Sequence, residues 1–106
     1  MDIKKAKLEK LLMEELAGFV MRELKDPRLP TVVITHVELS KDKTHAKIYF
    51  TTLEEGLEKE AEQVLEGAKN HIRAELTKRL RVRRLPELHF VFDRELKRME
   101  KIWERL

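Results

Sequence analysis

Apolar residues recur every three or four positions near the start of the chain, which is the period of one face of an α-helix. The residues of this stripe are Leu8, Leu11, Leu12, Leu16, Phe19, Val20 and Leu24. Pro27 disfavours helical geometry at Asp26, and a second proline follows at Pro30. The pattern therefore predicts a helix over residues 6–24 that ends near Lys25.

Strict alternation after Pro30 predicts two half-buried strands. In the first, one side carries Val33, Thr35, Val37 and Leu39, and the other carries His36, Glu38 and Ser40. In the second, Ala46, Ile48 and Phe50 alternate with His45, Lys47, Tyr49 and Thr51. The polar residues 41–44 separate the two strands, so we expect a turn there and an antiparallel hairpin around it.

A second helical pattern runs over residues 57–80, and its phase changes midway. Its apolar positions are Leu57, Ala61, Val64, Leu65, Ala68, Ile72, Leu76 and Leu80. At about 100° per residue, the stripes before and after Ala68 are centred roughly a quarter turn apart. Glycine and asparagine tolerate the backbone angles of a break. We therefore predict two helices separated by a kink at Gly67, Ala68 and Asn70.

A third strand is predicted after Pro86, where Leu88, Phe90 and Phe92 alternate with Glu87, His89 and Val91. Asp93 can cap a final helix over about 94–105, with Met99 and Trp103 in its apolar stripe. A helical crossover places the second and third strands parallel. We expect one α+β domain over residues 1–106, with a core at about 6–93 and a three-stranded mixed sheet that has its helices packed on one face.

Charge is abundant but nearly balanced, so its distribution matters more than its total. Charged residues make up 41% of the chain, yet 23 Lys and Arg against 20 Asp and Glu leave a net charge of +3. The helical region is acidic before the predicted kink and basic after it. The basic residues are Lys69, Arg73, Lys78, Arg79, Arg81, Arg83 and Arg84. Such clustering indicates a phosphate-rich partner, although heat-adapted proteins carry similar solvated surfaces.

Residues for catalysis or for binding a cofactor are scarce. The chain has no cysteine, a single serine at Ser40, and three glycines too far apart for a phosphate-binding loop. His36, His45 and His89 fall on the sheet face opposite the core, but alternation fixes only their face and not their distance. We therefore expect no enzyme, no cofactor and no metal site, with these histidines exposed or facing RNA.

The first residues mix charged and apolar side chains and lack the apolar run of a signal peptide or membrane span. With the absence of cysteine, this favours a cytoplasmic protein. The sequence has no long coiled-coil pattern that would indicate an oligomer, so we expect a monomer.

Four segments together resemble the ribosome-binding factor A family, from about Leu8 to Asp93. They are RELKDPRLP at residues 22–30, ITHVELSKD at 34–42, AKIYFT at 46–51 and RVRRLPELHFVFD at 81–93. The resemblance implies a type II KH fold of order α-β-β-α-α-β. It also implies a non-catalytic assembly factor that binds the free small (30S) ribosomal subunit and its 16S rRNA, supports late maturation and processing of the rRNA 5′ end, and contributes to cold adaptation.

One position departs from the family pattern. The family is similar to KH domains, whose GxxG loop clamps nucleotide backbone, but it carries an Ala-x-Gly kink, and here the matching residues are Ala68, Lys69 and Asn70. We expect the RNA contact at Lys69, Asn70, Arg73, Lys78, Arg79, Arg81, Arg83 and Arg84. The alternatives are a general KH-type RNA-binding module and an adaptor that binds protein through Tyr49 or Trp103.

Overall fold

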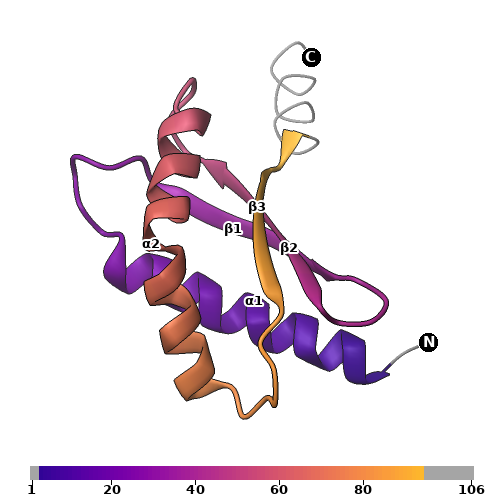
Figure 1. Ribbon diagram of the computed structural model, residues 1–106. Coiled ribbons are helices and arrows are strands. Elements are labelled where there is room, and N and C mark those ends of the chain that lie inside the picture. The colour runs from indigo at the N-terminus through magenta and orange to yellow at the C-terminus, as the bar shows by residue number, and fades with distance from the viewer. Residues whose placement is uncertain (1–2, 95–106) are drawn as a thin grey trace.

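The computed structural model describes residues 3–94, which form two helices and one sheet (Figure 1). The elements are α1 (Ile3–Glu23), β1 (Val32–Leu39), β2 (His45–Thr52), α2 (Glu58–Arg79) and β3 (Glu87–Phe92). The strand order is β1-β2-β3, with β1 antiparallel to β2 and β2 parallel to β3. The α+β class and the three-stranded mixed sheet are therefore confirmed. The predicted final helix lies outside the described residues.

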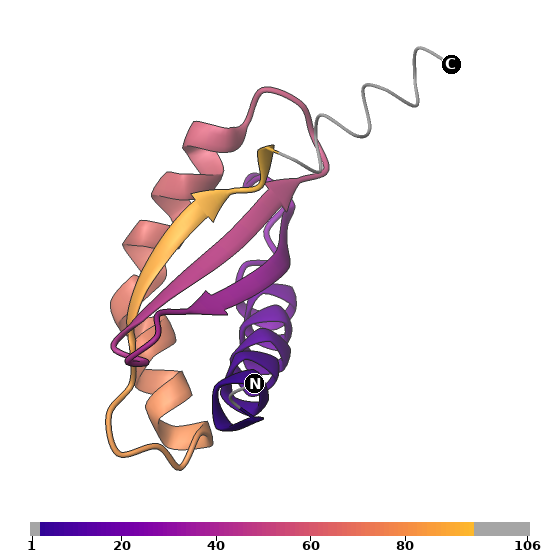
Figure 2. The same cartoon turned by 90° about the vertical axis from the view of Figure 1, so that its right-hand side faces the viewer.

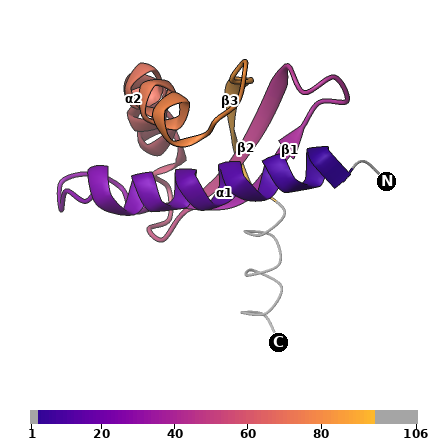
Figure 3. The ribbon, with the colours of Figure 1, turned by 90° about the horizontal axis from the view of Figure 1, so that it is seen from below.

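Both helices cover the same face of the sheet, and no element of residues 3–94 covers the other face (Figure 2). Seen from below, α1 runs across the molecule and α2 crosses it instead of lying along it (Figure 3). An edge contact between the rings of Phe19 and His71, 5.3 Å apart, joins the two helices. No described helix is long and apolar enough to cross a bilayer.

The core lies between the helices and the covered face of the sheet. Its fully buried side chains include Leu12, Leu16, Ala46, Ile48, Phe50, Ala61, Leu65, Ile72 and Leu88. Each large apolar side chain buried in this way contributes about 1.5–3 kcal/mol. Phe50 and Phe90 were predicted to be buried and are, while Phe92 is half-buried and meets the Phe50 ring edge-on.

The break predicted at Gly67, Ala68 and Asn70 is wrong, because α2 is a single uninterrupted helix. The buried residues of α2 are Ala61, Leu65, Ile72 and Leu76. At 100° per residue they fall within about 60° of arc, so one helix can bury all of them against one sheet. The apparent phase change came from counting Val64 and Leu57, which are only half-buried, as core residues.

The predicted inward face of β1 is correct only in its second half. A register shift between Ile34 and His36 leaves Thr35 as the extra residue of a β-bulge. Before the bulge Val32 and Ile34 are buried, while Val33, expected in the core, is 38% exposed. The Thr35 hydroxyl donates to the Asp93 carboxylate at 2.7 Å.

The turn between β1 and β2 is organised by Asp42. Its carboxylate accepts hydrogen bonds from the Thr44 hydroxyl at 2.7 Å, the Ser40 hydroxyl at 2.8 Å and the Thr44 amide at 3.1 Å. These bonds lower the pKa of Asp42 to about 2. Lys43 supplies the left-handed backbone of the turn, with φ of 63°. The first residue of β2, His45, is thereby placed against Ser40, whose hydroxyl accepts from the His45 amide at 3.0 Å.

Candidate nucleic-acid interface

An open depression of about 590 Å³ lies where the second half of α2 meets the starts of β2 and β3. It is lined by Thr44, His45, Lys69, Asn70, Arg73, Arg84, Leu85 and Glu87. The parallel pairing of β2 with β3 brings these segments together, since His45 lies opposite Glu87 and the Glu87 amide donates to the Thr44 carbonyl at 2.9 Å. Four of the predicted RNA-binding residues therefore share one site.

The residues from α2 are held in place by contacts that leave them positively charged or able to form hydrogen bonds. The Arg73 guanidinium donates to the Pro86 carbonyl at 2.8 Å, so it keeps further N–H donors. The Lys69 ammonium lies 3.5 Å from the Glu66 carboxylate and 6.0 Å from the centre of the Phe90 ring. An ion pair between residues three positions apart on a helix surface stabilises the helix by only about 0.2–0.5 kcal/mol. Asn70 is exposed beside them.

The segment that joins α2 to β3 carries Arg81, Arg83 and Arg84, and all three are exposed. Within residues 3–94, none of them makes a hydrogen bond or an ion pair. An arginine fork can grip two oxygens of a phosphate at once. These three side chains are therefore available to a phosphate-bearing ligand without first breaking a described contact.

Lys78 and Arg79 are paired with acidic neighbours, as Lys69 is, but they lie outside the depression. The Lys78 ammonium lies 3.7 Å from the Glu75 carboxylate. The Arg79 guanidinium lies 3.6 Å from Glu15 of α1 and 3.7 Å from Glu75. Arg79 thus links α2 to α1, and neither residue lines the depression.

Gly67 leaves the surface of α2 bare one turn before Asn70. It is exposed, and a Cβ atom built on it would have no neighbouring atom within 4 Å. Neither Gly67 nor Asn70 has a positive φ, so both keep right-handed helical geometry. The helix backbone is consequently accessible at Gly67, the residue just before the positions that match the family pattern, Ala68 to Asn70.

Sequence reasoning missed Thr44 and His45 as lining residues. They belong to a turn and strand far from the basic run, and neither adds to its charge. The sequence feature that could have identified them is the predicted parallel pairing of the second and third strands, because parallel strands can begin side by side. Without the register, however, that pairing could not identify which residues meet.

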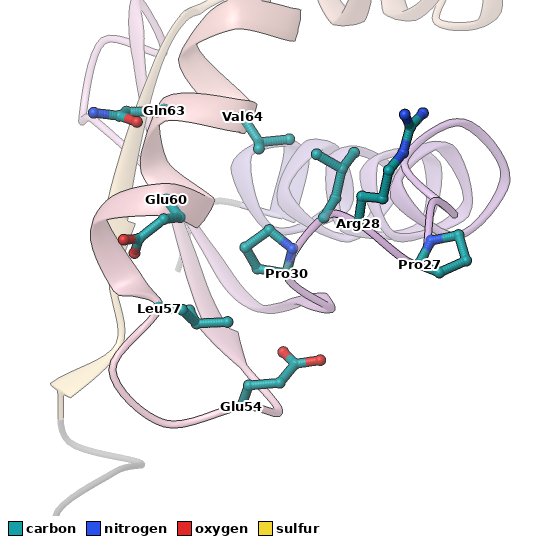
Figure 4. A pocket seen from close by; sticks show the side chains of 9 residues that line it. Pro27, Arg28, Pro30, Glu54, Leu57, Glu60, Gln63 and Val64 are labelled. Atoms are coloured by element: carbon teal, nitrogen blue, oxygen red, sulfur yellow. The ribbon is translucent and has the colours of Figure 1, made fainter.

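A second depression, of about 550 Å³, lies between the start of α2 and the segment after α1 (Figure 4). Figure 4 shows Glu54 and Glu60 at its rim, together with Leu57. The Glu54 carboxylate accepts from the Thr31 amide and hydroxyl at 3.0 and 2.8 Å. Arg28, which also lines this depression, is paired with the Asp26 carboxylate at 3.0 Å. The acidic groups make it a poor site for phosphate.

Comparison with known proteins gives consistent matches. A family model described as ribosome-binding factor A matches residues 4–106. The chain is 40% identical over 92 residues to ribosome-binding factor A of Neisseria gonorrhoeae, covering 87% of this chain and 75% of that protein. The crystal structure of ribosome-binding factor A from Thermus thermophilus has a TM-score of 0.73 at 38% identity, covering 83% of this chain and 93% of that one.

A further similar set of coordinates is a homology model of Thermus thermophilus ribosome-binding factor A, fitted into a cryo-EM map of its complex with the 30S subunit. It has a TM-score of 0.71 at 37% identity and covers 86% of this chain and 97% of that one. The likeness to these structures fits the KH-like arrangement expected from the sequence, with two helices in place of three over the described residues.

Proposed function

The chain belongs to the ribosome-binding factor A family, and from this premise we propose that it binds the free small (30S) ribosomal subunit through 16S rRNA. The observation that carries the proposal is the depression shared by Lys69, Asn70, Arg73 and Arg84. The related Thermus thermophilus protein, which was fitted into a map of its 30S complex, supports the choice of partner.

Phosphate contacts supply most of the binding free energy in this account. Each cation that neutralises a phosphate releases a condensed counterion, so binding weakens as salt rises. Arg81, Arg83 and Arg84 are exposed and without described partners, and they approach the RNA backbone first. Lys69 and Arg73 are held by Glu66 and Pro86, and they fix the position of the strand in the depression.

Asn70 and Gly67 add contacts of another kind. The Asn70 side chain both donates and accepts hydrogen bonds, so it can bind a ribose hydroxyl or a base edge. At Gly67 the bare helix surface lets the RNA backbone approach α2 closely. This arrangement replaces the loop of a KH domain with the side of a continuous helix.

In the proposed role the protein binds rRNA and catalyses no reaction. We assign the protein to late maturation of the small subunit in the cytoplasm, where it assists processing of the rRNA 5′ end and supports growth in the cold. It acts as a monomeric assembly factor and not as an enzyme. Binding of this kind stabilises one conformation of the RNA relative to others.

Selectivity for its ligand tests this function. We expect the protein to bind free small subunits at least about tenfold more tightly than whole ribosomes or random single-stranded RNA, because only the free subunit presents the complete rRNA surface. Co-sedimentation at one fixed salt concentration measures all three. Equal affinity for small subunits and random RNA would instead identify a general RNA-binding module.

A further inference from the structure

The sheet face opposite the helices carries a cluster of His45, Glu87 and His89, two of which, His45 and Glu87, also line the edge of the basic depression. His45 of β2 and His89 of β3 are neighbours there, with the His45 Nδ1 2.9 Å from the His89 Nε2. A carboxylate oxygen of Glu87 lies 3.8 Å from the same His45 Nδ1. One ligand atom from each of the three residues lies within 4.8 Å of the others. The third histidine of this face, His36, instead contacts the ring of Tyr49.

We propose that His45, Glu87 and His89 form a binding site for a divalent transition-metal ion, with zinc as the best fit. Two imidazole nitrogens and one carboxylate are a ligand set that zinc uses, and a water completes its tetrahedron. With zinc–nitrogen distances of about 2.0–2.1 Å, two ligand nitrogens in a tetrahedron are about 3.3 Å apart. The present 2.9 Å needs only a few tenths of an ångström of opening.

The backbone holds these three ligands close together. His45 is opposite Glu87 in the parallel ladder, and Glu87 and His89, two residues apart in β3, point to the same face. The His45 carbonyl accepts from the Ser40 amide at 2.8 Å, and its amide donates to the Ser40 hydroxyl. Because the sheet and its turn fix the ligands, little backbone freedom is lost when the ion binds.

The surroundings leave room for the ion and its water. A further open depression, of about 490 Å³, lies beside the cluster and is lined by His45, His89, Glu38, Ser40, Lys47 and Val91. Glu38 adds a carboxylate to the lining of this depression. Lys47 is exposed, so its ammonium can extend into solvent and reduce repulsion of the ion.

The short distance between the histidines also fits a hydrogen bond between one protonated and one unprotonated ring nitrogen. In that case the Glu87 carboxylate, 3.8 Å from the His45 Nδ1, would act as the ion-pair partner of a protonated ring instead of as a metal ligand. The two accounts differ in one measurable property, which is whether the protein binds zinc through these residues.

Isothermal titration of zinc chloride into the full chain, produced without a histidine tag and stripped with a chelator, tests the proposal. We expect one zinc ion per chain and a thermal midpoint raised by roughly 10–20 °C at a hundredfold excess of zinc over the dissociation constant. His45→Ala and His89→Ala should each weaken binding at least about tenfold, and Glu87→Gln should weaken it measurably.

His36→Ala is the matched control, because it removes a histidine from the same face outside the cluster, and it should bind zinc as the parent does. Absence of binding by the parent chain, or equal binding by the parent and His89→Ala, would overturn the proposal. The titration contains no RNA, so its result does not depend on the function proposed above. Circular dichroism of each variant shows whether a loss of binding is instead a loss of fold.

Discussion

The side chain of Asp42 organises the turn between β1 and β2. Three hydrogen bonds to one carboxylate oxygen hold the turn that places His45 at the start of β2. The sequence predicted a turn at residues 41–44 from its polar composition alone. It could not show which side chain organises that turn, because Asp42, Lys43 and Thr44 are all polar residues of the kind found in turns.

The pKa of Asp42 leads to a prediction about stability and pH. Its pKa is lowered from 3.8 to about 2 in the folded protein, so the charged form stabilises the fold. This contribution is complete above about pH 4 and is lost as the pH falls through about 2. The difference in thermal midpoint between the parent and Asp42→Ala should therefore be constant from about pH 7 to about pH 5 and shrink towards about pH 2. A difference that persists undiminished in acid would contradict this account.

The sequence shows which residues are charged. It does not show which of these charges are paired within the protein and which are available to a ligand. Arg79 and Arg84 look alike in the basic run, yet Arg79 is paired with Glu15 and Glu75 while Arg84 lines the depression. The partner Glu15 comes from α1, far away in the sequence. Only the packing of α1 against α2 separates a structural cation from one that is available to a ligand.

At the scale of elements, hydrophobic periodicity located all five described elements. It erred where tertiary structure departs from a regular period. In β1 the bulge at Thr35 shifts the buried positions by one residue, so the residues buried before and after it do not follow one alternating pattern. In α2 some apolar residues lie beside the buried stripe and not in it. Counting them as core residues made one wide apolar face look like two separate faces, and this led to the wrong prediction of a break.

The continuity of α2 leads to a prediction for Gly67. Glycine inside a helix costs about 0.5–1 kcal/mol relative to alanine, and a Cβ at Gly67 meets no atom within 4 Å. Gly67→Ala should therefore raise the free energy of unfolding by about that amount, measured by urea denaturation. An unchanged or lowered value would show that the helix is not regular at Gly67.

A matched control for this variant is Gly18→Ala in α1. There the new Cβ would lie 2.9 Å from the Arg22 guanidinium, which must move, so the gain should be smaller. The same Gly67→Ala protein also reports on the RNA contact. If the RNA backbone packs against bare helix at Gly67, this variant binds small subunits more weakly although it is more stable.

At the scale of the whole molecule, one sheet separates two kinds of surface. Both helices cover one face (Figure 2). The opposite face carries the His45, Glu87 and His89 cluster, and the basic depression, which shares His45 and Glu87 with it, lies at the end where β2 and β3 begin. The net charge of +3 is too small to attract RNA over a long range. The proposed binding of RNA therefore depends on the local group of cations around the depression.

The sequence could predict the class of fold, the parallel crossover and the basic character of the site. It could not predict the depression itself, since Thr44 and His45 enter it only through the register of β2 with β3. Nor could it separate the two cations of α2 that line the depression, Lys69 and Arg73, from Lys78 and Arg79, which do not line it.

The salt dependence of binding to free small subunits tests the central claim most directly. The variant Arg81→Gln, Arg83→Gln, Arg84→Gln removes three exposed cations that have no described partner, so its fold should be unchanged. A control with Lys4→Gln, Lys7→Gln, Lys10→Gln removes the same charge from exposed positions of α1. We predict that the arginine variant binds at least about tenfold more weakly and that its slope of log affinity against log salt falls by about 2–3, while the control changes little. An arginine variant with the affinity and the slope of the parent would contradict the account.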